Sequence, residues 1–571
     1  MRTDTRLRIR VLSIIFVLIA TILVVRLYFV QIVHGQAYRD DALGQYVQED
    51  SSSDKRGTIF FTAKDGTLVP AAIMQHGWRI ALVPRDVADA TTTFDALNAI
   101  TPIDPARFFG SVAKKSDPYE EVAFRISSSD AQKIRDLDLP GILLVQDAWR
   151  FYPGGELAAQ AIGFVGYRGD TKTGLYGIER SMNSTLTFTN DGRSVNPFAE
   201  IFANISAALS FDPSAHRGDV VTTIEPNVQR ELEGTLDGIM KTYTPRLAGG
   251  IVMDPKTGAI IAIGARPTFN PNTYNLASDP SMYSNPLVEG RWELGSIMKP
   301  LTMAAGIDTG AITTQTTYED TGCITRSGKK ICNYDFKARG MIPMQEVLNQ
   351  SLNTGATFVM EKTGHTVFAR YINQFGLGQK TGIELPNEVT GDIRALSGNA
   401  DVDFASASFG QGFAVSPLEM TRALASLAND GKLPSPHIIS AIRYESGIMR
   451  TISPAPPVAV MKPETAETVT NMLITVFDKA LLHGELKHDH YSVAAKTGTA
   501  QIGMPGGGGY YTDRYLHSFF GYFPAHNPKF IIFLFAVEPH GVEYASASLA
   551  HPFDDIEQFL IHYYDVPPDR H

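Results

Sequence analysis

The chain of 571 residues contains only two cysteines, Cys323 and Cys332. Their spacing matches no common zinc motif, because no second pair of Cys or His residues lies at the interval that such sites use. In an oxidising compartment the two thiols can form a disulfide across a hairpin with Ser327-Gly328-Lys329 at its turn. Otherwise they remain free thiols, and both alternatives stay open.

Positive charge is also scarce. Lys and Arg number 50 against 60 Asp and Glu, so the net charge is −10. No basic stripe with interleaved aromatic residues is present, which argues against general nucleic-acid binding. A Gly-x-Ser-x-Gly elbow is missing as well, and this disfavours a hydrolase of the Ser-His-Asp type.

The N-terminus departs from the otherwise ordinary globular composition. Arg2, Arg6, Arg8 and Arg10 precede an apolar run, Val11–Val33. As a helix this run would be about 34 Å long, enough to span a bilayer. The arginines predict a cytoplasmic N-terminus and an exported remainder. A cleavable signal peptide is the alternative, disfavoured by the length of the run and the lack of a small-x-small cleavage site.

Three short motifs follow one another in the second half of the chain. They are Ser296-Ile297-Met298-Lys299, Ser351-Leu352-Asn353 and Lys496-Thr497-Gly498-Thr499. Together they supply a serine nucleophile, amines that can handle its proton, and a basic, hydroxyl-rich strand for a carboxylate. These are the groups that acyl transfer through a covalent serine ester requires.

Each motif occurs more than once in the chain, so the surrounding residues decide which copy is the catalytic candidate. The other copies begin at Ser52, Ser111, Ser327, Ser181, Ser397, Lys172, Lys256, Lys362 and Lys380. Ser296 alone is followed by Lys299-Pro300 and an apolar run, which predicts a helix beginning at Ser296. Lys496 lies in an extended stretch of small residues that predicts a strand. Residues 249–253 and 259–264 predict a hairpin, and Ser518–Phe523 with Phe530–Val537 predict strands flanking the Lys496 strand.

A histidine cluster precedes the Lys496 strand. It contains His483, His488 and His490, with Asp489 among them. The cluster is compatible with a metal site or with a polar loop, and we favour the polar loop.

Several further motifs carry a resemblance to a known family. They are Arg56-Gly57-Thr58-Ile59 with Asp65-Gly66, Arg150-Phe151-Tyr152-Pro153 with residues 174–179, and Ser408-Phe409-Gly410-Gln411-Gly412 with Ser416-Pro417. With the three catalytic motifs, they make the chain similar to class B penicillin-binding proteins from about residue 10 onward.

The resemblance implies a multidomain α+β fold. We expect a cytoplasmic tail (1–10), a single transmembrane helix (11–33), an elongated mixed α/β pedestal or dimerisation domain (34–245) and a transpeptidase domain (246–571). In the family the transpeptidase domain has an antiparallel sheet of about five strands between helical clusters.

The resemblance also implies catalytic roles. Ser296 is the nucleophile and Lys299 is the base. The Ser351 hydroxyl lies between the catalytic lysines Lys299 and Lys496 and relays a proton to the leaving amine. Asn353 contacts the substrate backbone and helps to hold Lys299.

The Lys496 strand is expected to bind substrate. Thr497, Gly498 and Thr499 belong to this binding strand, and backbone N–H groups of Ser296 and Thr499 form the oxyanion hole. No metal or organic cofactor is implied.

The implied activity is peptidoglycan D,D-transpeptidation through an acyl-serine, on stem peptides that end in D-Ala-D-Ala, with β-lactams as inhibitors. Ser-x-Asn favours the division type over the elongation type. A D,D-carboxypeptidase, a β-lactam sensor and a non-catalytic division scaffold are the alternatives. Expected partners are a polytopic glycosyltransferase of the SEDS class and other division proteins, with the catalytic domain outside the cytoplasmic membrane.

Overall fold

The structure is a computed structural model that describes Thr21 and residues 55–169, 171–187, 217–444, 447–506 and 508–570. The predicted transmembrane run 11–33 lies outside the described residues, apart from Thr21. Within the described residues, no helix is both long and apolar enough to cross a bilayer. The chain divides into two compact units, which agrees with the expected multidomain organisation.

The first unit includes Met74–Arg150. Its elements are the second half of β2 (Leu68–Leu82), α3 (Ala90–Asn98), α4 (Pro105–Val112), β3 (Glu120–Ile126), α5 (Ser128–Asp136) and β4 (Ile142–Phe151). The side chains of Asp89, Asp104 and Ser127 cap the three helices by accepting backbone N–H groups. The apolar helix faces pack around a small core that contains Phe108.

The second unit includes Gly57–Ile73, Phe151–Leu186 and Asp212–His571. Its N-terminal segments thus group with the C-terminal part of the chain, and the predicted domain boundaries stay predictions. One sheet of this unit contains, in order, β16 (Met449–Thr451), β15 (Ile439–Tyr444), β7 (Gly218–Thr222), β1 (Ile59–Thr62) and the first half of β2.

A five-stranded antiparallel sheet forms the centre of the second unit. Its order is β18 (Ala494–Gly503), β19 (Tyr510–Phe523), β20 (Phe530–Val537), β8 (Leu247–Met253) and β9 (Ile260–Arg266). The prediction that both later strands flank β18 is wrong: among the strands that the structure describes, β18 lies at the sheet edge and pairs with β19 alone. An edge strand keeps one row of backbone groups unpaired within the sheet, so it can accept a substrate backbone there.

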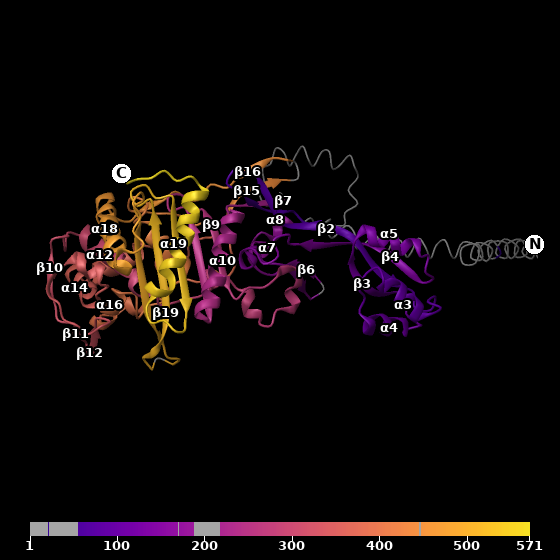
Figure 1. The fold of residues 1–571 in the computed structure, drawn as a ribbon, viewed down its shortest axis with the longest axis horizontal. Coiled ribbons are helices and arrows are strands. Elements are labelled where there is room, and N and C mark those ends of the chain that lie inside the picture. The colour runs from indigo at the N-terminus through magenta and orange to yellow at the C-terminus, as the bar shows by residue number, and fades with distance from the viewer. Residues whose placement is uncertain are drawn as a thin grey trace, which may run out of the picture. The chain divides into compact units, whose positions relative to one another are not determined.

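Strand β20 shows how the two faces of this sheet are covered. Ile532 and Leu534 belong to the core formed with α10 (Pro226–Tyr243) and α19 (Ala545–Tyr563), whereas Phe533 joins the core on the opposite face. Alternate side chains of a strand point to opposite faces, so an apolar strand such as β20 requires a helical layer on each side. Figure 1 shows α10 and α19 beside the sheet.

The remaining elements of the second unit are mostly short. Before the catalytic motifs lie α6 (Ala159–Ile162), β5 (Val165–Arg168), β6 (Thr171–Gly174), α7 (Gly177–Ser181), α8 (Asn183–Leu186), the short helical segments η3 (Pro271–Leu276) and η4 (Pro280–Tyr283), and α11 (Pro286–Glu289). The short helical turn η5 (Gly295–Met298) contains Ser296 itself. From the nucleophile onward the elements are α12 (Lys299–Asp308), β10 (Thr317–Asp320), β11 (Cys323–Arg326), β12 (Lys329–Cys332), β13 (Gly340–Pro343), α13 (Met344–Asn349), α14 (Asn353–Thr363), α15 (His365–Gln374), η6 (Arg394–Ser397), α16 (Asp401–Ala407), α17 (Pro417–Ala425), β14 (Lys432–Leu433), β17 (Val458–Ala459), α18 (Pro463–Thr475), η7 (Val476–Ala480) and η8 (Leu481–Gly484).

The two cysteines form a disulfide. Cys323 and Cys332 lie opposite each other on β11 and β12, and their Cα atoms are 4.0 Å apart. Of the two alternatives that the sequence left open, the structure therefore has the bridged hairpin.

Candidate active site

The nucleophile segment has the local structure that its sequence predicts. Ser296 lies in the single turn η5, which continues directly into α12. Pro300 occupies the first turn of α12, where a missing N–H removes no intrahelical hydrogen bond. The serine therefore stands at the start of a buried helix.

Two glycines allow close approaches around this turn. A Cβ atom at Gly498 on β18 would lie 2.6 Å from the Leu294 carbonyl oxygen, so any larger residue would push the strand away from the turn. Gly295 has a φ of +65°, which disfavours other residues, and its N–H donates to the Gly410 carbonyl over 3.0 Å. The Lys496 motif and the Ser408–Gly412 segment thus both lie against the nucleophile turn.

Lys299 links the first two motifs. Its Nζ lies 2.8 Å from Ser296 Oγ, and it also donates to the Ser351 carbonyl over 2.5 Å. The residue is only 1% exposed. Burial, and then the neighbouring charge of Lys496, hold the pKa of Lys299 well below its ordinary value.

Lys496 approaches the same serine from β18. Its Nζ donates to Ser351 Oγ over 3.0 Å, while Lys299 Nζ lies 3.2 Å from that oxygen. Burial lowers the pKa of Lys496 to about 7. The Ser351 hydroxyl therefore lies between two buried amines, one of which is within reach of Ser296.

This arrangement can move protons. A neutral amine at Lys299 can accept the Ser296 proton, and the Ser351 hydroxyl can pass a proton between the two lysines. Ser351 has a φ of +55°, an uncommon conformation for a residue with a side chain. Such backbone strain persists where the surrounding structure holds it in place, which often occurs at functional sites.

Asn353 begins α14 and is held from outside the helix. Its Nδ2 donates to the Cys332 carbonyl on the disulfide hairpin over 2.9 Å. The hydrogen bonds of Lys299 Nζ among the described residues go to Ser296 and Ser351 and not to Asn353, so the expected role of Asn353 in holding Lys299 stays a prediction.

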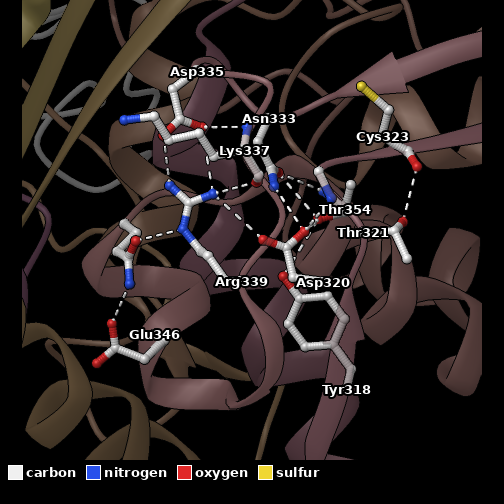
Figure 2. Close-up of polar contacts among 12 residues, drawn as sticks. Tyr318, Asp320, Thr321, Cys323, Asn333, Asp335, Lys337, Arg339, Glu346 and Thr354 are labelled. Atoms are coloured by element: carbon white, nitrogen blue, oxygen red, sulfur yellow. Dashed lines mark hydrogen bonds and ion pairs between the residues drawn. The ribbon is translucent and has the colours of Figure 1, made fainter.

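A buried polar network that no sequence motif predicted supports the second motif. Figure 2 shows Asp320 at its centre, accepting from Asn333 Nδ2 over 2.8 Å and from Thr354 Oγ1 over 2.9 Å. Asn333 Oδ1 in turn accepts the Thr354 backbone N–H over 3.2 Å. The residue that follows Asn353 is thus fixed by side chains that lie 21 and 34 positions earlier in the chain.

Arg339 extends this network to the residue before Ser351. It donates to Gln350 Oε1 over 2.5 Å, pairs with Asp335 over 2.9 Å and lies 3.4 Å from Asp320. We refer to Asp320, Asn333, Arg339 and Thr354 as the support network. No motif or periodicity marks these residues, so sequence reasoning had no signal by which to find them.

The predicted binding residues on β18 alternate between its faces. Lys496 and Gly498 are buried toward the nucleophile turn, whereas Thr497 and Thr499 are partly exposed. Thr499 Oγ1 accepts the backbone N–H of Ala545 at the start of α19 over 3.1 Å, and its own proton remains available for donation. The roles assigned to these residues stay predictions.

The histidines do not form a common cluster. The side chains of His483 and His490 are exposed. His488 instead faces α19, where its Nε2 lies 3.1 Å from Asp554 Oδ1.

The chain matches two families of known proteins. The family described as "Penicillin binding protein transpeptidase domain" matches residues 248–557. A second family, described as "Penicillin-binding Protein dimerisation domain", matches residues 53–200.

Similar proteins cover most of the chain. Stage V sporulation protein D of Bacillus subtilis is 28% identical and covers 94% of this chain and 82% of its own length. The peptidoglycan D,D-transpeptidase FtsI of Buchnera aphidicola is 25% identical, covering 98% and 95%. Among solved structures, penicillin-binding protein 3 of Mycobacterium tuberculosis in complex with aztreonam has a TM-score of 0.68 at 23% identity, covering 90% of this chain and 98% of its own.

Proposed function

The chain belongs to the class B penicillin-binding proteins and is a serine D,D-transpeptidase, and from this premise we propose that it cross-links peptidoglycan stem peptides during septal cell-wall synthesis. The observation that carries the proposed mechanism is the Ser351 hydroxyl held between two buried lysine amines, with one amine 2.8 Å from Ser296 Oγ.

In the first step, Ser296 Oγ attacks the carbonyl carbon of the penultimate D-Ala. Lys299 takes the serine proton, and a tetrahedral oxyanion forms beside the backbone N–H groups of Ser296 and Thr499. The C–N bond to the terminal D-Ala then breaks, and the departing amine receives a proton through Ser351. An ester of Ser296 remains.

In the second step, an amine of a neighbouring stem peptide attacks this ester. The new amide bond is the cross-link, and the Ser296 oxygen regains a proton as it leaves. Before the first step, Lys496 and the hydroxyls of Thr497 and Thr499 bind the terminal carboxylate of the donor peptide by charge and hydrogen bonds, and this carboxylate departs with the terminal D-Ala. A β-lactam enters the same first step, because its ring amide takes the place of the D-Ala-D-Ala bond.

The division type is favoured by Ser351-Leu352-Asn353, because elongation-type members of the family commonly carry Asp at the third position. The same family resemblance supports a single-pass anchor at residues 11–33, a periplasmic or extracytoplasmic catalytic domain, and a polytopic SEDS-class glycosyltransferase as partner.

Acylation provides the first test. Incubation with a labelled penicillin, followed by mass spectrometry of peptides, is expected to find the label on Ser296. If Ser296 remains unmodified, the chain acts as a non-catalytic scaffold.

Reconstitution provides the second test. The full chain with lipid II and a glycan polymerase is expected to produce cross-linked dimers. Trimmed tetrapeptides without dimers would instead indicate a D,D-carboxypeptidase, and acylation without turnover would indicate a β-lactam sensor. Imaging of a fluorescent fusion at the septum or along the side wall separates the division role from the elongation role.

A further inference from the structure

A histidine and two acidic side chains meet at a largely buried face of α19. His488 Nε2 lies 3.1 Å from Asp554 Oδ1 and 3.4 Å from Glu557 Oε1. The two acids are three residues apart and therefore share one face of the helix. His488 belongs to the segment that leads into β18.

Glu557 is the unusual member of this group. Its side chain is 0% exposed, and neither carboxylate oxygen accepts a hydrogen bond of good geometry from any residue that the structure describes, so its one cationic contact there is His488 at 3.4 Å. Buried carboxylates are ordinarily paired with a cation or bound to a metal, because an unpaired buried charge is costly.

The described neighbours leave this group short of positive charge. Among the described residues, His488 is the one basic side chain within ion-pair distance of either acid, so a single imidazole faces two carboxylates. Arg570, the nearby guanidinium, is already bound by Asp478 through two contacts of 2.7 and 3.1 Å. A divalent cation with a neutral imidazole would balance both carboxylates.

The spacing of the ligand atoms also fits a metal ion. The three atoms all lie within 4.8 Å of one another. Zinc bound at about 2.0–2.1 Å in a tetrahedron has ligand atoms about 3.3 Å apart, close to the two distances from His488. One imidazole nitrogen and two carboxylate oxygens form a three-residue set that leaves a fourth position for water.

We propose that His488, Asp554 and Glu557 bind a Zn²⁺ ion that ties α19 to the segment preceding β18. His488 borders a cavity of about 440 Å³, also lined by Tyr491 and His562, so this ligand of the proposed site lies beside open space. The proposed site takes no part in the acyl-transfer reaction, for which no metal is implied. By linking α19 to the segment before β18, the bound ion restricts the movement of β18, the strand that carries Lys496.

The test uses the full chain, first stripped of metal with a chelator and then titrated with Zn²⁺ by calorimetry. We expect one equivalent to bind and the melting temperature to rise by several degrees, because a ligand of the native state stabilises it. Replacement of Zn²⁺ by Co²⁺ is expected to produce the visible absorption of a tetrahedral site. If neither ion binds at one equivalent, the proposal is wrong and the three residues form an ion-paired cluster.

Variants locate the ion without relying on activity. Glu557→Gln keeps the shape of the side chain and is expected to weaken Zn²⁺ binding at least 100-fold, whereas the control His490→Ala, two residues from His488, leaves it unchanged. His488→Lys distinguishes the alternatives, since it keeps a cation beside the two acids but cannot replace the imidazole ligand. Zn²⁺ affinity that survives in Glu557→Gln or in His488→Lys would overturn the assignment.

Discussion

The lysine pair (Lys299 and Lys496) and the support network both place ionisable side chains in buried positions around Ser351. They differ in that the lysine pair lacks counterions, whereas the support network combines opposite charges. Lys299 and Lys496 are 1% and 2% exposed, and no carboxylate of the described residues forms an ion pair with either of them. In the support network, the fully buried Asp320 side chain accepts several hydrogen bonds and lies 3.4 Å from Arg339. Like charges without counterions produce neutral, reactive amines, whereas opposite charges with hydrogen bonds fix a backbone in place.

The comparison also explains how the two regions work together. Ser351 contacts both lysines, and its neighbours Gln350 and Asn353 are held by Arg339 and by the Cys332 carbonyl. The backbone of Ser351, which has an uncommon positive φ, is therefore held in place by contacts to the residues on either side of it. Damage to the lysine pair should affect chemistry first, and damage to the support network should affect stability first.

The largest effect is expected from Lys299→Met. Without an amine near Ser296 no group takes the serine proton, so the rate of acylation by labelled penicillin should fall by about 10⁴-fold. The exposed Lys241→Met on α10 serves as the matched control and should acylate normally. Acylation of Lys299→Met at the wild-type rate would exclude this lysine as the base.

Lys496→Met should lower the acylation rate by about 10²- to 10³-fold, because one end of the Ser351 relay and a charge for the substrate carboxylate are lost. The variant also removes the cation whose charge helps to lower the pKa of Lys299. The rising limb of the acylation rate against pH should therefore move to higher pH. An unchanged or acid-shifted limb would contradict the coupling of the two lysines.

The same substitution changes how stability depends on pH. Burial lowers the pKa of Lys496 from 10.5 to about 7, so between these values the unfolded chain binds more protons than the folded protein. The free energy of unfolding of the wild type should then rise with pH across this window, by up to a few kcal/mol. In urea titrations at several pH values, Lys496→Met should lack this contribution and be the more stable protein near pH 6.

Asp320→Ala tests the support network. It leaves buried donors of Asn333 and Thr354 without their acceptor, so the free energy of unfolding should fall by about 2–4 kcal/mol. Loss of position at Ser351 should slow acylation by about 10-fold. The exposed neighbour Thr321→Ala is the control, and equal effects in both variants would show that the network has no special role.

The smallest effect on activity is expected from joint replacement of Cys323 and Cys332 by serine. Removing a bridge between residues nine positions apart should lower the free energy of unfolding by about 2–3 kcal/mol. Asn353 binds the Cys332 backbone carbonyl rather than its sulfur, so acylation should change by no more than about threefold. Loss of acylation in the folded variant would mean that the bridge itself holds Asn353.

Much of the local structure could be predicted from the sequence. Pro300 and the apolar residues after Ser296 indicated a helix start, and the run Phe530–Val537 indicated a buried strand. These signals are local, because helix caps and side-chain periodicity depend on residues a few positions apart. The edge position of β18 was missed, since strand order depends on long-range pairing that a single sequence does not reveal.

The sequence by itself determined which functional groups are available. It showed which serine, lysines and asparagine lie at predicted helix starts or in predicted strands that suit acyl transfer. Only the tertiary structure decided which groups meet, bringing Lys496 to Ser351 across 145 positions, Asp320 to Thr354 and His488 to Glu557. The physical reason is that burial and the distance between charges set the pKa of a lysine and decide whether a carboxylate has a hydrogen-bond partner. Both are fixed only when distant segments pack together.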